Sequence, residues 1–244
     1  MSEQGQSSPA ATLAALPAGL RRDLERFADA IQAPLPKEGE ARRARLLAAD
    51  EEGELLAQGL IQALDGQNAA QLEEVLDWLR ERGVYDVSTA LLEAAWGLDL
   101  PLDLLGRIAE DWIGAIFFGI GDRVGAEEVA RHLVPRAKAL GPAFANDLSH
   151  FLMGLKLREA ARPLVHFAGT SLPGDDSARF HLGIMHKFDC EWAESARCFE
   201  EILERREDQA SRWNLAIARV ALRDWEAARE SWSALQIQLP PGEG

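Results

Sequence analysis

The chain has 244 residues, among them 40 Ala and 35 Leu but only 21 Val, Ile and Thr together. Because strong helix formers outnumber β-branched residues more than threefold, a β-sandwich, barrel or parallel sheet is disfavoured and an all-α fold is expected. Lys and Arg total 26 against 40 Asp and Glu, giving a formal net charge of −14, which disfavours nucleic acid and an anionic membrane surface as partners.

Three features indicate a cytoplasmic protein. Cys190 and Cys198 fit neither a disulfide framework nor a CxxC pair. No basic segment precedes an apolar one at the N-terminus, as a signal peptide would require. The uncharged apolar run 112–121 is about half as long as a membrane span, so it is expected to form a buried helix.

The N-terminal quarter of the chain divides into two parts. Residues 1–19 are rich in small and polar residues and are expected to be flexible. Residues 20–66 have apolar residues at three- and four-residue spacing, which predicts two amphipathic helices, or a divergent first repeat. Pro34 ends the first helix, and the second runs from about Glu38 to Gly66.

Residues 67–244 are predicted to form an array of helix pairs with short turns. Glycines at the predicted helix ends are expected to adopt a left-handed conformation. They are Gly83, Gly97, Gly121 and Gly141. Pro135 and Pro163 fall inside helical patterns and are expected to kink or shorten their helices.

Two segments near the C-terminus repeat one another. ARFHLGIMHKFDCEWAESARCFEEIL, from Ala178, aligns without a gap with SRWNLAIARVALRDWEAARESWSAL, from Ser211. Phe180 matches Trp213, and the later matches include Leu182 with Leu215, Ile184 with Ile217, Trp192 with Trp225 and Phe199 with Trp232. Small residues recur at Gly183 and Ala216, and at Ser195 and Ala228, where two antiparallel helices can approach closely.

These two units resemble tetratricopeptide repeats. The same register continues backward through Ile113, Gly114 and Phe117, and the spacings between successive units are 38, 35, 34 and 33. The resemblance implies an all-α fold of antiparallel helix-pair repeats stacked into a right-handed solenoid. In such a solenoid, the first helix of each pair lines a concave groove.

On that register the groove residues run from acidic to apolar along the chain. The acidic end comprises Glu73, Asp77 and Asp111, with Arg80 nearby, the middle comprises Asn146, His150 and Met153, and the last part comprises Phe180, Ile184, Lys187, Phe188, Trp213, Asn214 and Ile217. Such a surface would suit a peptide or helix with basic residues at one end and apolar anchors at the other. The alternative is that the apolar residues of this set only pack against adjacent helices.

The expected function is therefore a non-catalytic protein–protein interaction module, an adaptor or scaffold. A second hypothesis, based on the charge of −14, is an acidic immunity-type inhibitor that sequesters a basic bacterial toxin or effector. A third is a metal or catalytic role for His181, His186 and Cys190, but a further ligand at zinc-like spacing is missing. No enzyme activity, metal or cofactor is expected. The exposed apolar side of the terminal repeat instead indicates a homodimer, a partner protein or a further domain in a longer parent protein.

Overall fold

The computed structural model describes residues 16–32, 40–64 and 69–237, and these residues form helices and no strand. The all-α fold expected from the composition is confirmed for this part of the chain. Contacts divide the fold into two compact units, Met1–Val129 and Ala130–Gly244, with the boundary inside one helix.

Met1–Val129 contains helices that pack mainly around α5. They are α2 (Ala18–Gln32), α3 (Glu40–Leu64), α4 (Ala69–Glu81), α5 (Tyr85–Trp96), α6 (Leu102–Gly114), the π-helix η2 (Ala115–Ile120) and the start of α7 (Arg123–Leu140). Helix α5 packs against α3, α4 and α6, and its buried residues Leu91 and Leu92 lie in this core. The predicted helix from Glu38 to Gly66 is observed as α3, although Glu38 and Gly66 themselves lie outside the described residues.

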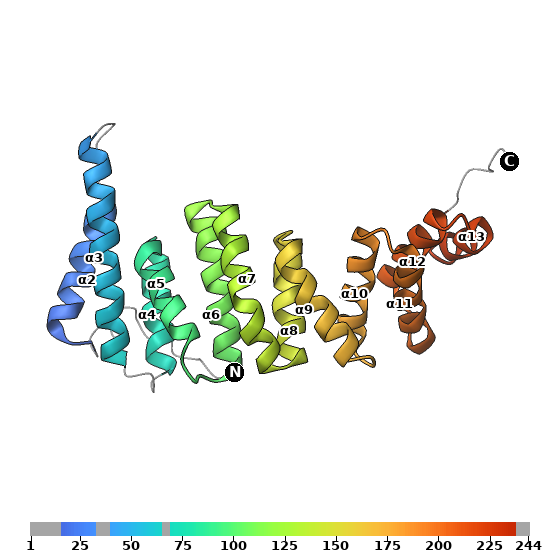
Figure 1. Cartoon of the computed structure of the whole chain (residues 1–244), viewed down its shortest axis with the longest axis horizontal. Helices are drawn as coiled ribbons and strands as arrows, with labels where there is room; N and C mark the ends of the chain where they lie inside the picture. The colour runs from blue at the N-terminus through green and yellow to red at the C-terminus, as the bar shows by residue number, and fades with distance from the viewer. Residues whose placement is uncertain (1–15, 33–39, 65–68, 238–244) are drawn as a thin grey trace, which may run out of the picture. The chain divides into compact units, whose positions relative to one another are not determined.

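Ala130–Gly244 contains the rest of α7 and three antiparallel helix pairs (Figure 1). The pairs are α8 (Pro142–Gly154) with α9 (Arg158–Ser171), α10 (Asp176–Phe188) with α11 (Trp192–Arg205), and α12 (Gln209–Ala221) with α13 (Trp225–Ala234). Each helix contacts the next, and the first helices also contact one another, α8 with α10 and α10 with α12. Each pair therefore buries its apolar surface against its neighbours as well as within itself.

A left-handed residue lies in the turn between the two helices of each pair. These residues are Gly83, Gly121, Lys156, Cys190 and Arg223, with φ between 60° and 78°, and their successive spacings are 38, 35, 34 and 33. The next amide donates to a carbonyl five residues earlier in most of these turns, at 2.9 Å from Leu157 to Leu152 and 2.8 Å from Glu191 to His186. This Schellman geometry satisfies carbonyl groups at the helix end. The spacings equal those predicted from the sequence.

The close approach of α10 and α11 depends on two small residues. A Cβ atom at Gly183 would lie 2.9 Å from Phe199 Cζ and 3.0 Å from Cys198 Cβ. Ser195 Oγ donates a hydrogen bond of 2.9 Å to the carbonyl of Gly183. The small residues at these repeat positions thus have the packing role that the sequence predicts.

Two local predictions are wrong. Gly97 has φ −74° rather than a positive value, because three-residue hydrogen bonds close this helix end: the Gly97 amide donates to the carbonyl of Ala94 and the Leu98 amide to that of Ala95. The run 112–121 is not one buried helix: α6 gives way to η2, where Phe118 is 70% exposed and Ile120 is 52% exposed. The wider π-helical turn adds a residue, so the amide of Asp122 bonds to the carbonyl of Ile116.

Pro135 and Pro163 both lie inside helices, α7 and α9, which continue to Leu140 and Ser171, so the predicted shortening at these prolines does not occur. Of the helices in the described residues, none combines the length and the apolar character needed to span a membrane.

Candidate functional site

One repeat position recurs along the whole predicted groove. Each of its residues lies ten positions before the left-handed turn residue of its pair. They are Glu73, Asp111, Asn146, Phe180 and Trp213. The side chains at this position, which we call the seam position, change from carboxylates to an amide to aromatic rings along the chain.

The carboxylates of the predicted acidic end are paired with arginines. Glu73 on α4 pairs with Arg107 on α6. Asp111 on α6 lies 3.2 Å from Arg80 on α4, and Arg80 also pairs with Asp77. Burial raises the pKa of Asp111, while Arg80 opposes that shift. The structure therefore brings Glu73, Asp77 and Asp111 together in ion pairs, in which the arginines balance much of their negative charge.

In the middle of the predicted groove, Asn146 and His150 on α8 both bond to His181 on α10. Asn146 Oδ1 lies 3.1 Å from His181 Nδ1, and His150 Nδ1 lies 2.9 Å from His181 Nε2. An amide oxygen only accepts hydrogen bonds, so His181 Nδ1 carries the proton and its Nε2 accepts from His150 when the ring is neutral. Asn146 Nδ2 also donates to Ser177 Oγ over 3.3 Å.

The environment of His181 favours the neutral ring. Burial and, to a smaller extent, the neighbouring His150 ring lower its pKa to about 4. Asp175 is the charged group that opposes this effect. Because His181 is 7% exposed whereas His150 is exposed, protonating His181 would place a charge inside the contact between α8 and α10.

Further along the chain, Lys187 on α10 bonds to Asn214 on α12. Lys187 Nζ donates to Asn214 Oδ1 over 2.5 Å, and Asn214 Nδ2 donates to the carbonyl of Ala210. Burial lowers the pKa of Lys187. Met153 is half-buried on α8. The predicted polar residues of Ala130–Gly244 thus join the first helices α8, α10 and α12 pairwise. We call the surface formed by Asn146, His150, Met153, His181, Lys187 and Asn214 the first-helix surface.

Phe180 and Ile184 pack between helices. Both lie against a buried cluster that combines Phe199 and Ile202 of α11 with Leu215 and Ala218 of α12. The Phe180 ring meets that of Phe199 edge to face, with centroids 5.6 Å apart. This arrangement favours the packing interpretation of these two residues over exposure in a groove.

Trp213 and Ile217, the counterparts of Phe180 and Ile184, lie on the last helix pair. The Trp213 ring meets that of Trp232 edge to face at 4.7 Å, yet Trp213 remains 47% exposed. Ile217 is half-buried. Phe188, at the end of α10, is 40% exposed and lies beneath the guanidinium of Arg158 at 3.7 Å.

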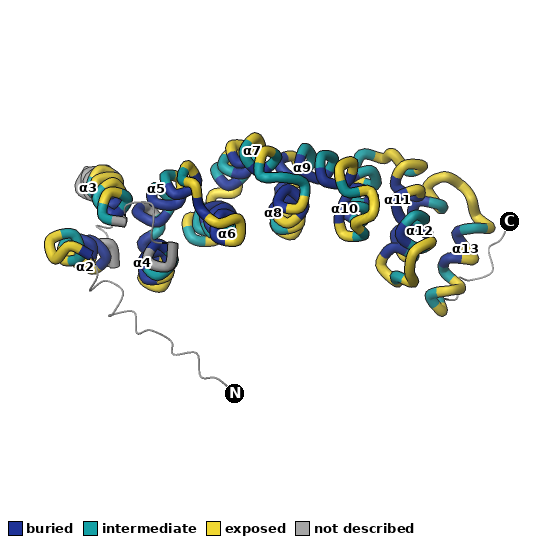
Figure 2. Tube along the Cα trace, turned by 90° about the horizontal axis from the view of Figure 1, so that it is seen from below, coloured by how far each residue is buried: buried dark blue, intermediate teal, exposed yellow. Residues whose placement is uncertain are grey.

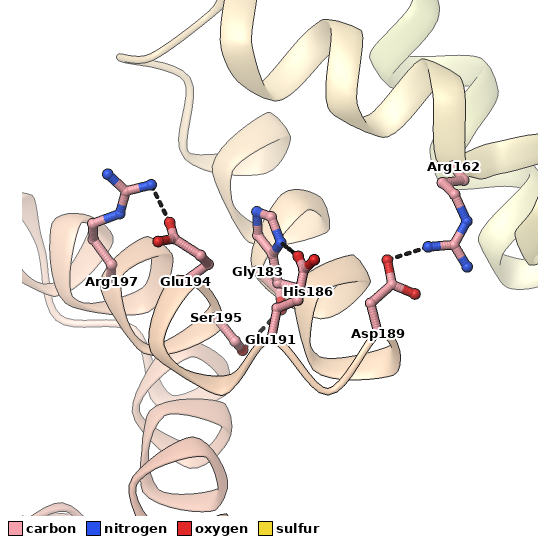
Figure 3. Close-up of polar contacts among 8 residues, drawn as sticks. All are labelled: Arg162, Gly183, His186, Asp189, Glu191, Glu194, Ser195 and Arg197. Atoms are coloured by element: carbon pink, nitrogen blue, oxygen red, sulfur yellow. Dashed lines mark hydrogen bonds and ion pairs between the residues drawn. The ribbon is translucent and has the colours of Figure 1, made fainter. Parts of the chain in front are cut away.

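The residues considered for metal binding or catalysis face different neighbours. His181 bonds to α8, whereas His186 Nδ1 lies 2.6 Å from Glu191 Oε2, at the turn that carries Cys190 (Figure 3). Ser149 is buried and donates to the carbonyl of Asn146. Within the described residues, no group of three His, Cys, Asp or Glu side chains is placed to hold a metal ion.

The sequence interpretation missed the groups that complete these contacts. Arg107, Ser177 and His181 were not assigned to the predicted surface, although each lies on a first helix beside a residue that was. Each of them follows its partner, Glu73, Asn146 or His150, by about one repeat length, and this offset is a signal that could have identified them. A residue about one repeat away on the next first helix is the natural neighbour in a stacked array.

The class defined by this geometry is an all-α protein of consecutive antiparallel helix pairs. No protein-family model matches the chain, and no curated protein is similar to it in sequence. Among solved structures, it is similar to the crystal structure of BtubC (BKLC) from P. vanneervenii, with 17% sequence identity and a TM-score of 0.44, over 82% of this chain and 95% of that chain. A likeness of this size assigns neither family nor function.

Proposed function

We propose that the chain is a non-catalytic protein–protein interaction module of the tetratricopeptide type, an adaptor or scaffold that binds a peptide or partner helix on the first-helix surface. The observation that supports this proposal most is the side-by-side contact of α8, α10 and α12, bridged by His150 with His181 and by Lys187 with Asn214. Three helices held in this way form a preorganised surface, so a partner binds without ordering the receptor first.

Two kinds of side chain on this surface suit a peptide. Exposed His150 and half-buried Lys187 offer polar groups that can bond to a peptide main chain. Half-buried Met153 offers a flexible apolar contact. This combination of fixed polar groups with an adaptable apolar one is typical of peptide-binding surfaces.

A selection from a random displayed peptide library on the immobilised full chain tests the proposal. Selected peptides should bind the His150→Ala/Met153→Ala double variant at least about fivefold more weakly, since each loss is of the order of 1 kcal/mol. Arg197→Ala is the matched control, because this exposed residue pairs with Glu194 on α11 (Figure 3). If the peptides bind the double variant as tightly as Arg197→Ala and the unchanged chain, the first-helix surface is not their binding site.

The second candidate is an inhibitor that sequesters a basic protein, and the formal charge of −14 favours it. Electrostatic attraction of this kind speeds association and weakens steeply with salt. Raising the salt concentration about tenfold from a low starting value should slow association with a basic partner by at least about tenfold. Because Glu73 and Asp111 are paired with arginines, such a partner must exchange those ion pairs or use other carboxylates.

A further inference from the structure

The last helix pair repeats the aromatic contacts of the pair before it. Phe180 meets Phe199 edge to face at 5.6 Å, and their counterparts one repeat later, Trp213 and Trp232, meet edge to face at 4.7 Å. Each ring pair bridges the two helices of its own pair. The face on which these rings lie is therefore built in the same way in both pairs.

In the α10–α11 pair this face is covered by the next helix, α12. Phe199 is 0% exposed, and Leu215 and Ala218 of α12 lie in the same buried cluster. Trp192 of α11 packs against the edge of that cluster. Helix α12 thus shows what kind of segment covers this face: an amphipathic helix that places a leucine and, three residues later, an alanine against it.

In the α12–α13 pair the same face is open among the described residues. Trp225, the counterpart of Trp192, is 54% exposed, Trp213 is 47% exposed, and Trp232 is half-buried where Phe199 is fully buried. Figure 2 shows that the arc of chain leading into α13 is exposed, and residues 220–226 are all exposed. We call this surface the terminal face and define it by Trp213, Ile217, Trp225, Arg229 and Trp232.

One residue of the terminal face differs in charge from its counterpart. Arg229 stands where the preceding pair has Ala196, which lies in the cluster covered by α12. Arg229 is exposed, and no ion pair joins it to another residue in the described parts of the chain. A carboxylate on the covering helix would complement this guanidinium.

We propose that the terminal face binds an amphipathic helix of a partner protein, with a Leu-x-x-Ala contact like that of α12 and an acidic residue opposite Arg229. This site is separate from the first-helix surface. A second copy of the chain suits the face less well, because the contact would join two chains that each carry a formal charge of −14.

The register of the bound helix follows from α12. Arg219 of α12 lies 3.0 Å from Glu200 of α11. Glu200 follows Ala196, the counterpart of Arg229, by one helical turn. Glutamate at the Arg219 position of a docked helix therefore lies within about one turn of Arg229. A stapled peptide with the sequence Gln209–Leu222 and the change Arg219→Glu is the probe, and the same peptide with Arg219 retained is its matched control.

Calorimetric titration of the full chain with both peptides tests the proposal. The acidic peptide should bind the unchanged chain about threefold more tightly than the Arg219 peptide, and Arg229→Glu should reverse that order. Trp225→Ser should weaken both peptides at least about tenfold, because it removes a tryptophan anchor from an exposed position that does not carry the fold. Phe118→Ser, which alters another exposed aromatic residue, should leave the affinities unchanged.

Three results would overturn the proposal. The first is equal binding of the peptides by the Trp225→Ser variant and the unchanged chain, or no binding by either. The second is a dimer of the unchanged chain that Trp225→Ser dissociates, which would make a second copy the occupant. The third is peptide binding only after the chain is shortened to end at Ile237, which would assign the face to residues 238–244. None of these results bears on the first-helix surface, which is tested through His150 and Met153.

Discussion

The α10–α11 and α12–α13 pairs align residue for residue, yet their equivalent faces differ in burial. Phe199 is 0% exposed beneath α12, whereas Trp232 is half-buried, and Trp192 is half-buried where Trp225 is 54% exposed. The repeat pattern therefore specifies the same kind of face twice: α12 covers it in the α10–α11 pair, and it is open among the described residues in the α12–α13 pair. Stability in such an array is the sum of what each pair contributes and what each contact between pairs adds.

The largest difference is expected for truncation of the buried aromatic residue of each pair. Phe199→Ala removes a ring that is fully enclosed between α10, α11 and α12, so the free energy of unfolding should fall by about 3–5 kcal/mol. Trp232→Ala removes a larger ring from an uncovered face, and its cost should be at most about half as great. Urea unfolding followed by circular dichroism compares the two. Equal losses would mean that the two faces are equally covered.

The close approach of α10 to α11 is tested by Gly183→Val. The new Cβ would meet Phe199 Cζ at 2.9 Å, and the added methyl groups would force the helices apart, at a cost of about 2–3 kcal/mol. Gly154→Ala is the matched control at an open position in α8, where alanine should stabilise the helix by up to about 1 kcal/mol. Thermal unfolding of both variants measures the contrast. A harmless Gly183→Val would show that the two helices do not need this contact.

The contact between α8 and α10 at His181 is expected to make stability depend on pH. The pKa of His181 is about 4 in the folded chain against 6.5 as the ordinary value, so the unfolded chain binds more protons between these values. The free energy of unfolding should therefore keep its full value above pH 6.5 and should decrease as the pH drops towards 4. At pH 5 the decrease should be about 2 kcal/mol. Urea unfolding at pH values of about 7.5 and about 5 measures this change.

His181→Asn provides the control for that titration. Asparagine can still bond to Asn146, but it does not titrate, so this part of the pH dependence should disappear. The α12–α13 pair has Asn214 at the repeat position that His181 occupies in α10, and it should add no such titration. An unchanged pH profile in His181→Asn would assign the acid sensitivity to other groups.

The smallest difference is expected at the hydroxyl of Ser195. Ser195→Ala removes its buried hydrogen bond to the carbonyl of Gly183 and should cost about 1 kcal/mol. The counterpart change, Ala228→Ser, adds a hydroxyl at the matching position of the last pair and should change stability by less than about 0.5 kcal/mol. Chemical unfolding of both variants resolves this difference, and a larger effect at Ala228 than at Ser195 would reverse the comparison.

Much of the fold follows from the sequence because its pattern is strong. Helix formers and apolar spacing predict the helices, and the match between the segments from Ala178 and Ser211 predicts the period of the turns. Glycine also predicts the left-handed residues Gly83 and Gly121. The same conformation at Lys156, Cys190 and Arg223 carries no such signal, because Schellman hydrogen bonds outweigh the steric cost of about 1–2 kcal/mol for a side chain there.

The candidate site follows from the sequence less well. Position in the repeat identifies the residues of the first helices, but it does not separate those that face solvent from those that face the next pair. Glu73 and Phe180 share the seam position, where Arg107 or the cluster around Phe199 contacts them. The identity of that neighbour depends on the rotation of one helix against the next. Similarly, η2 depends on local packing around Tyr85 and Gly119, which periodicity does not encode.

Hydrogen exchange of the full chain, read by mass spectrometry, tests the central comparison most directly. Amides in α10 and α11, which are covered on both sides, should exchange at least about a hundredfold more slowly than those in α12 and α13. Equal protection of the two pairs would contradict this prediction, because the terminal face would then already have its covering neighbour.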